Sequence, residues 1–234
     1  GDVEARDAAD APPPAADTPA APTAAPAADA AVERLLRSQG TMLEEIHNTG
    51  AIQASVSLTE LTGAEIRVSF PESRLVPLGE VSEQLGGAEA PVGGVYVGVG
   101  GDLDAGILLV VPVAHLLALD DLLHRRPEGT PTDVDRTDSS ALSESANLIA
   151  AAFVNAMANA AKLRLATAVP EISVDMCEAV LDSVLARFDR AGDRVLLTQA
   201  EIRWGSHSPM GCELLVFLAP ASLERLVTVL RSGG

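Results

Sequence analysis

Two short segments of the sequence carry the same pair of polar residues at the same spacing. Glu45 and Asn48 stand three residues apart, and Glu144 and Asn147 repeat the pair. A carboxylate attracts cations and accepts hydrogen bonds, whereas a carboxamide both donates and accepts them. Residues three apart on a helix lie side by side. Each segment therefore sets a charged acceptor beside a group that can contact water as donor and as acceptor.

Helical periodicity of about 100° per residue predicts that both pairs face outward. In the second helix the expected core stripe is Leu142, Ala146, Ile149, Phe153 and Met157, and the opposite side carries Glu144, Asn147, Ala151 and Asn155. In the first helix the expected core side is Leu43, Gly50, Ala54 and Leu61, and the outer side carries Glu45, Asn48 and Ile52.

An exposed Glu–Asn pair has an ordinary explanation, because surface helices are rich in solvated polar residues. Asn is a mediocre helix former, however, and two of the four Asn residues in the chain occupy these matching places. An inherited duplication can preserve such a pattern without function. Both explanations remain open at this point.

The elements around the two helices follow from periodicity and turn residues. In the first half we expect a helix over 31–63 with a capping box at Thr41, a strand over 65–70 ended by Pro71, strands over 92–99 and 106–111 joined by a hairpin turn, and a helix over 114–124. After a polar loop, the second half predicts a helix over 139–163, a strand within 162–169, a helix over 175–188, strands over 194–204 and 213–218, and a helix over 221–230.

The two halves form an internal repeat. The separation is 99 residues from Glu45 to Glu144, from Asn48 to Asn147 and from Pro71 to Pro170, and it is 107 from Ala114 to Ala221. The repeats extend over about 31–126 and 137–232. They predict an α/β (α+β) fold with pseudo-two-fold symmetry, a largely antiparallel sheet and two long outward-facing helices.

Residues 1–30 differ in composition from the rest of the chain. They repeat Ala and Pro and contain almost no large apolar residue. Such a segment buries too little surface to offset the entropy of ordering, so we expect a disordered linker before a single domain over 31–234.

Charge excludes several classes of partner. The formal net charge is −17 and Lys162 is the single lysine, whereas nucleic-acid backbones and anionic membranes are bound by clustered Lys and Arg. The longest apolar run, 107–119, contains Pro112 and His115 and is too short to span a bilayer. No basic segment followed by an apolar run precedes the domain. We therefore expect a cytoplasmic protein without membrane insertion.

The cysteines and histidines provide no evidence for a metal site or a catalytic triad. Cys177 and Cys212 lack a zinc-binding spacing, so buried reduced thiols are expected. The four histidines are scattered, and we expect His47 to pack near the core stripe rather than act as a base. Asp102 and Asp104 in the hairpin are interpreted as turn formers rather than calcium ligands. No cofactor of the chain's own is expected.

At the two Glu-x-x-Asn pairs the sequence resembles the CheC/FliY/CheX family of bacterial and archaeal chemotaxis phosphatases. The resemblance extends from about Leu35 to Leu230. Separately, the scarcity of lysine is typical of a protein from a GC-rich genome. Its strongest segments are 45–48, 54–58, 61–63 and 140–147, with support from 97–102, 106–110 and 180–185. Two active-site helices in one chain, with no extension like that of FliN, favour a CheC-type protein.

The resemblance implies a reaction and a role for each residue. The family removes the phosphoryl group from the aspartate of the response regulator CheY. By this resemblance Asn48 and Asn147 orient the attacking water, while Glu45 and Glu144 pair with the lysine of the regulator. Ile52 and Ala151 occupy equivalent outward positions that contact the partner. The Mg²⁺ is expected on the regulator, CheD is a second candidate partner, and a monomer is expected.

The first copy departs from the family pattern. His47 replaces a small Gly beside Asn48, and Ile52 is bulkier than its equivalent Ala151. We therefore expect His47 to crowd the docked regulator, and both copies to be competent with the second the stronger. The alternative from another class is a non-catalytic, FliM-like module of the flagellar switch that binds CheY or CheD.

Overall fold

The computed structural model describes residues 40–127, 130, 139–187, 194–204, 209–219, 221, 222, 225, 226, 228 and 229. The predicted linker over 1–30 and residues 31–39 of the first predicted helix lie outside this range. The described residues of the predicted closing helix are helical. None of the helices that the structure describes is long and apolar enough to cross a membrane.

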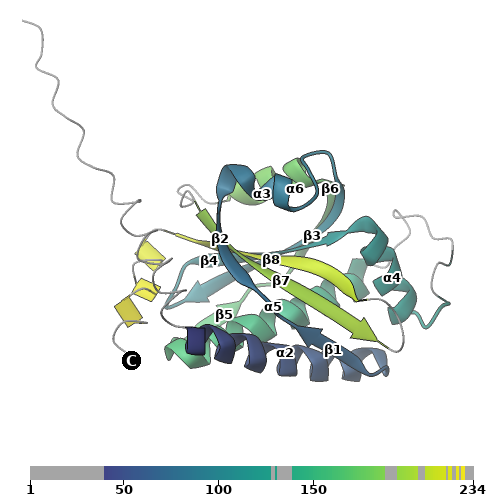
Figure 1. Ribbon diagram of the computed structural model, residues 1–234, viewed down its shortest axis with the longest axis horizontal. Coiled ribbons are helices and arrows are strands. Elements are labelled where there is room, and N and C mark those ends of the chain that lie inside the picture. Colours follow the sequence, from purple (N-terminus) through teal and green to yellow (C-terminus); the bar gives the residue numbers. More distant parts are fainter. Residues whose placement is uncertain are drawn as a thin grey trace, which may run out of the picture.

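The described strands form one antiparallel sheet, as the sequence predicts (Figure 1). The order along its main path is β1-β7-β8-β4-β3-β5, while β2 also pairs with β7 and β6 also pairs with β3. The strands are β1 (Ile66–Ser69), β2 (Ser73–Pro77), β3 (Pro91–Gly101), β4 (Ala105–Pro112), β5 (Leu165–Thr167), β6 (Glu171–Met176), β7 (Arg194–Trp204) and β8 (Met210–Leu218).

The two halves of the chain exchange their short strands. β1 and β2 of the first half pair with β7 of the second, whereas β5 and β6 of the second half pair with β3 of the first. At the centre β4 pairs with β8, and Leu108 lies opposite Leu215. These two residues are 107 positions apart, which is the later offset of the repeat. A pseudo-two-fold axis through this pair therefore relates the halves of the sheet.

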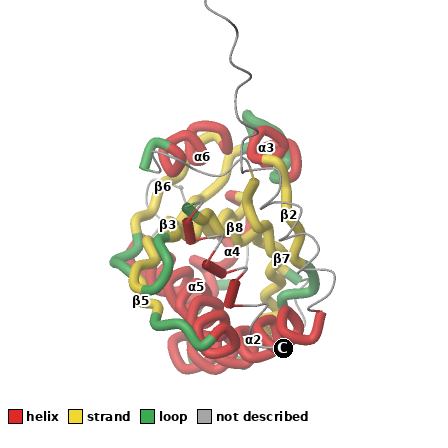
Figure 2. Tube along the Cα trace, turned by 90° about the vertical axis from the view of Figure 1, so that its left-hand side faces the viewer, coloured by secondary structure: helices red, strands yellow, loops and turns green. Residues whose placement is uncertain are grey.

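Helices cover both faces of the sheet. The long helices α2 (Gly40–Thr62) and α5 (Ser139–Ala161) lie side by side along one face, together with α4 (Val113–Leu123). The turn η1 (Leu78–Glu80) leads into α3 (Val81–Gln84), which lies with α6 (Cys177–Leu185) over the opposite face (Figures 1 and 2). The larger core lies on the side of α2 and α5 and the smaller on the side of α3 and α6. Ala, Val and Leu supply most of both, with Phe153 among the largest fully buried side chains.

Two strands, β2 and β6, are absent from the sequence prediction. The prediction left 73–77 unassigned and began a helix at Asp175, whereas that helix begins at Cys177 after β6. Both strands border the sheet, and most side chains of β6 are exposed. An edge strand without a buried face shows no clear alternation of apolar and polar residues, so periodicity does not reveal it.

Candidate functional site

The second Glu-x-x-Asn helix is positioned by a stripe of small and large apolar residues. The predicted stripe is buried at every position, as Leu142, Ala146, Ile149, Phe153 and Met157. Because these residues recur at intervals of three or four, α5 packs one face on the sheet and leaves the opposite face outward. Glu144 on that face is exposed, and Asn147 and Ala151 are half-buried.

The first helix packs along a slightly different stripe. Residues at intervals of four face inward, namely Ile46, Gly50, Ala54 and Leu58. The expectation that Leu61 faces the core is wrong, since its side chain is 43% exposed. Thr62 occupies the buried position instead and donates its hydroxyl to the carbonyl of Leu58 at 2.8 Å. Glu45, Asn48 and Ile52 are exposed, as predicted.

Gly50 lets the two helices approach closely. A Cβ atom at this position would lie 3.3 Å from Cε2 of Phe70 and 3.5 Å from the carbonyl oxygen of Ala152. A larger side chain would force α2 away from α5. The close contact therefore keeps both outward faces in one helical layer, each presenting its Glu-x-x-Asn pair.

Asn147 differs from Asn48 in its surroundings. The Oδ1 atom of Asn147 is shielded from solvent and has no hydrogen-bond partner among the described residues. An unsatisfied buried acceptor costs about 1–3 kcal/mol. Such a cost is common at functional sites, where a local rule is broken for the sake of activity. A donor from outside the chain reaches this atom only after a change of the Asn147 rotamer brings it to the surface.

His47 turns toward the sheet and away from the outer face. Its Nε2 lies 2.8 Å from Oγ of Ser73 in β2, and that hydroxyl lies 2.6 Å from Oγ1 of the buried Thr198. The ring also packs near Phe70, with centroids 6.2 Å apart. Burial lowers the pKa of His47, although Glu44 opposes the shift. The expected packing role of His47 is therefore confirmed, whereas the expected crowding of the docked regulator stays a prediction.

Neither cysteine is suited to nucleophilic chemistry. Cys177 and Cys212 are free and buried, as predicted. Burial raises the pKa of both thiols, and that of Cys212 rises to about 12. The described residues include no group of three His, Cys, Asp or Glu side chains that could hold a metal ion.

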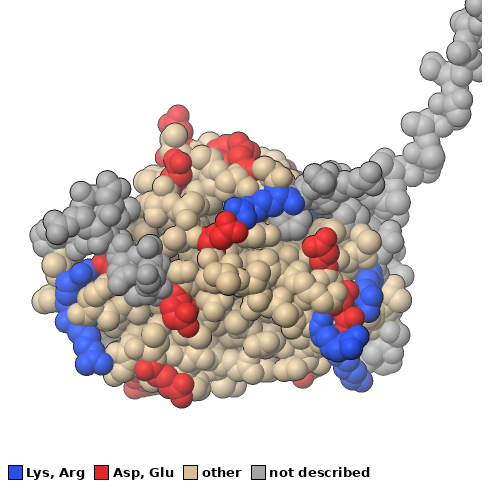
Figure 3. All heavy atoms as spheres, turned by 180° about the vertical axis from the view of Figure 1, so that it is seen from behind, with Lys and Arg blue, Asp and Glu red and all other residues tan. Residues whose placement is uncertain are grey.

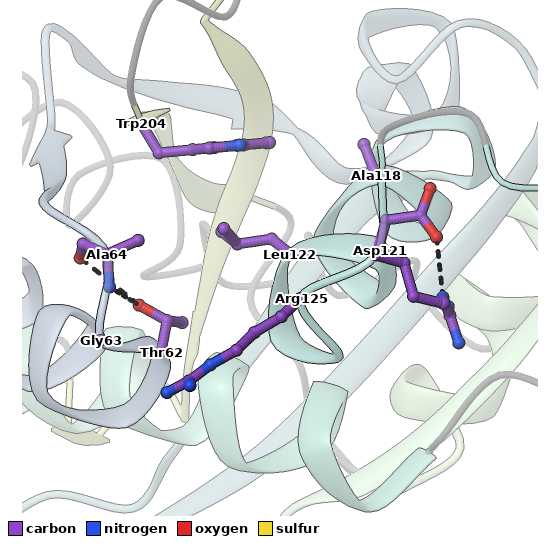
Figure 4. Close-up of a pocket in the computed structure, with 9 residues that line it drawn as sticks. Thr62, Gly63, Ala64, Ala118, Asp121, Leu122, Arg125 and Trp204 are labelled. Atoms are coloured by element: carbon purple, nitrogen blue, oxygen red, sulfur yellow. Dashed lines mark hydrogen bonds and ion pairs between the residues drawn. The ribbon is translucent and has the colours of Figure 1, made fainter.

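A hollow at the far end of α2 is separate from the Glu–Asn pair. Trp204 and Leu122 form apolar walls, and Arg125 extends toward Thr62 (Figure 4). Thr62 lies 14 residues beyond Asn48, which corresponds to about 21 Å along a helix. The hollow is therefore not part of the Glu–Asn site.

Most described arginines are engaged by nearby carboxylates. Those within ion-pair distance are Arg67, Arg74, Arg126, Arg164, Arg187, Arg203 and Arg225. On the rear of the molecule, basic side chains are scattered and several lie beside acidic ones (Figure 3). Nothing in the described surface resembles the continuous basic face that a nucleic-acid backbone requires.

Sequence reasoning missed a groove beside the first pair. It lies between α2 and β1 and begins at His47 and Asn48. Val56, which the sequence prediction did not single out, forms part of its rim and is 53% exposed. The spacing could have predicted this position, because Asn48, Ile52 and Val56 recur at intervals of four and therefore lie on one helix face.

No protein-family model matches the chain. In sequence it is similar to the CheY-P phosphatase CheC of Bacillus subtilis (strain 168). The two are 29% identical over 171 residues, which cover 72% of this chain and 82% of that protein.

Solved structures with a similar fold include FliY and the middle domain of FliM. FliY of Thermotoga maritima has a TM-score of 0.65 at 15% identity, and the match covers 83% of this chain and 96% of that one. The middle domain of FliM from H. pylori has a TM-score of 0.56 at 11% identity and covers 84% and 98%. At these identities the likeness concerns the fold alone.

Proposed function

The resemblance to the CheC/FliY/CheX family is confirmed in sequence and fold, and on this premise we propose that the chain is a phosphatase. Its substrate is the phospho-aspartate of a CheY-type response regulator. The similarity to CheC, named as a CheY-P phosphatase, supports this assignment. The two outward Glu-x-x-Asn pairs supply groups suited to the chemistry.

The proposed mechanism relies on positioning. An acyl phosphate is already activated, so the catalyst gains most by holding a water molecule in line with the phosphorus–oxygen bond that breaks. Asn48 or Asn147 holds that water, because a carboxamide can donate to one partner and accept from another. Water attacks phosphorus, the aspartate carboxylate leaves, and inorganic phosphate is released.

The glutamates dock the regulator in this proposal. Glu45 and Glu144 each lie one turn before the corresponding Asn and are exposed. Either carboxylate can form an ion pair with the lysine of the regulator beside the phosphoryl group. Ile52 and Ala151, one turn after each Asn, contact the same partner. Mg²⁺ belongs to the phosphorylated regulator and neutralises charge on the phosphoryl oxygens.

One observation carries the proposal. Two Glu-x-x-Asn pairs lie at equivalent places on adjacent helices, and both face away from the core. In addition, Asn147 has an acceptor atom without a partner. That atom is shielded from solvent, so a donor reaches it only after the side chain changes rotamer, and the outward position of the two pairs is the observation that supports the proposal.

A decay assay tests the proposal. A CheY-type receiver domain phosphorylated with acetyl phosphate should lose its label faster in the presence of this protein. The double variant Asn48→Ala, Asn147→Ala should reduce the acceleration by about 100-fold, the usual effect of losing a positioning group. Asn159→Ala is the matched control, because Asn159 is an exposed Asn on the same helix α5. Equal rates for the double variant and wild type would exclude the proposed roles.

The second candidate is a non-catalytic module that binds CheY or CheD at the flagellar switch. The fold shared with the FliM middle domain favours it. Binding of the phosphorylated receiver domain without any faster decay would support this candidate over the phosphatase. CheD as a partner, a monomeric state and a cytoplasmic location remain part of the proposal, and mixing with CheD and light scattering would test the first two.

A further inference from the structure

The groove beside Asn48 has an apolar floor whose polar groups are already paired. Ser55 donates its hydroxyl to the carbonyl of Ala51 at 2.6 Å and accepts the backbone N–H of Val68 at 2.8 Å. Phe70 is buried and packs edge-on against Phe153, with ring centroids 5.5 Å apart. The buried ring of Phe70 and the paired hydroxyl of Ser55 leave the floor largely apolar, so the groove suits an apolar side chain.

The rim of the groove is the most exposed apolar surface on α2. Ile52 is 66% exposed, and Val56 follows it by one turn and is also exposed. The two side chains adjoin, so they form one exposed apolar patch and not two isolated apolar residues. Asn48 precedes them by one turn, so the three side chains form one stripe that begins at the proposed catalytic residue.

The second copy lacks this apolar rim. Its equivalent positions, 99 residues later, are Ala151 and the exposed Asn155. The residue equivalent to Phe70 is Val169, which is 84% exposed and therefore does not form a buried floor. The two copies thus share the Glu–Asn pair but differ in the surface beside it.

We propose that the groove between α2 and β1 is a docking site for one apolar side chain of the phosphorylated regulator, and that it makes the α2 copy the tighter-binding of the two. The inference rests on the proposed function, because only a partner that brings its phosphoryl group to Asn48 must cover the adjoining stripe. The occupant is an aliphatic or aromatic side chain that flanks the phosphorylated aspartate.

Charge around the groove agrees with such a partner. Glu45 is exposed and extends the stripe by one turn before Asn48, where it can pair with the lysine that the proposed function assigns to the regulator. At the other wall Arg67 is held by Glu65 at 2.8 Å, so the pair presents both signs to solvent. The order along the stripe is therefore carboxylate, carboxamide and aliphatic, which a basic, phosphorylated and apolar surface complements.

The two copies should differ in their affinity for the regulator and in their turnover rate. Asn48 is exposed, whereas Asn147 is half-buried and is packed more closely by its neighbours. A restrained group is better preorganised for the reaction. The α2 copy is therefore expected to have the lower KM, and the α5 copy the higher kcat.

Two single-copy enzymes test the proposal. Asn147→Ala leaves the α2 copy, and Asn48→Ala leaves the α5 copy. With the receiver domain phosphorylated by acetyl phosphate, the KM of the α2 copy should be roughly tenfold lower. In the Asn147→Ala background, a further Ile52→Ala or Val56→Ala change should raise KM roughly tenfold with kcat almost unchanged. This is the effect expected for losing two or three buried carbon atoms.

Val174→Ala is the matched control. Val174 is an aliphatic residue of β6, 43% exposed and outside the proposed site, so this change should leave KM as in wild type. An unchanged KM in both groove variants, or a lower KM for the α5 copy, would overturn the proposal.

A separate measurement distinguishes failure of the groove from failure of the phosphatase assignment. If wild type does not accelerate decay at all, the proposed function fails. The groove is then tested by the affinity of the receiver domain carrying beryllofluoride and Mg²⁺, a stable substitute for its phosphorylated form. A roughly tenfold weaker affinity for Ile52→Ala than for wild type supports docking in the groove, whereas an equal affinity of the two, or an undetectable affinity for wild type, overturns it.

Discussion

Asn48 and Asn147 occupy equivalent positions 99 residues apart, yet Asn48 is exposed to solvent and Asn147 is not. The side chain of Asn147 is half-buried, and its Oδ1 is shielded and without a partner among the described residues. The two equivalent residues are therefore of the same type but lie in different environments. Because of this difference, replacing the two Asn residues should change stability by different amounts, although their proposed catalytic roles are the same.

Asn147→Ala is expected to raise stability while it removes the turnover of the α5 copy. The change deletes the unsatisfied acceptor and replaces a mediocre helix former with the best one. We expect the free energy of unfolding to rise by about 1 kcal/mol, measured by urea denaturation. Asn48→Ala is the comparison and should gain only about 0.5 kcal/mol from helix propensity. A loss of stability in Asn147→Ala would mean that the Oδ1 atom is satisfied in solution.

Ser73→Ala is expected to destabilise the anchorage of α2 on the sheet. The hydroxyl of Ser73 links His47 with the fully buried Thr198. Its removal leaves two partners unsatisfied and should lower the free energy of unfolding by about 1–3 kcal/mol. Ser82→Ala, at a serine of α3 whose side chain has no such link, is the control. Equal denaturation midpoints for the two variants would contradict the anchoring role.

His47 should also make stability depend on pH. Burial lowers its pKa in the folded protein below the ordinary 6.5, so the unfolded chain binds the proton more readily. Stability is then full above pH 6.5 and falls as pH drops from 6.5 toward the folded pKa. In His47→Gln the midpoint of urea denaturation should change less with pH across this interval. An equally steep dependence in His47→Gln would assign the effect to another group.

The parts of the fold that follow from local pattern were predicted well. α5 was expected over 139–163 and spans Ser139–Ala161, and β7 has the expected bounds. These elements present a continuous apolar face, which fixes their periodicity. β2 and β6 were not predicted because they border the sheet and are defined by partners at least 75 residues away in the chain.

The site shows the same division between local and distant information. The outward position of both pairs follows from helix periodicity, and the repeat links them. The direction of His47 depends on Ser73, which lies 26 residues later on a strand that the sequence did not reveal. The half-burial of Asn147 likewise depends on packing in three dimensions. The roles of Glu45, Asn48, Glu144 and Asn147 stay predictions that kinetics must test.

Glu213→Gln is expected to stabilise the protein at neutral pH. Burial raises the pKa of Glu213 above its usual value, and its Oε2 has no partner among the described residues. The folded state therefore binds the proton more readily, so the carboxylate lowers stability increasingly as pH rises through its folded pKa. The midpoint of thermal unfolding should be higher for the variant at pH 7 and similar at pH 4. A constant difference at both values would point to packing and not to charge.

The ends of the two long helices allow a matched pair of backbone predictions. Gly63 and Lys162 are equivalent residues, and both have positive φ angles, of 73° and 54°. Gly63 closes α2 with a hydrogen bond to the carbonyl of Thr59, and the N–H of Leu163 closes α5 on Ala158. Only glycine adopts this conformation without a steric cost of about 1–2 kcal/mol.

Lys162→Gly should therefore raise the free energy of unfolding by about 0.5–1 kcal/mol, after allowance for the greater entropy of an unfolded glycine. Gly63→Ala should lower it by about 1 kcal/mol or more, and its Cβ would also lie 3.1 Å from Nη2 of Arg125. Urea denaturation of both variants measures these two changes in the free energy of unfolding. If Lys162→Gly is less stable than wild type, the lysine side chain must make a compensating interaction, and the symmetry between the two helix ends would be limited to the backbone.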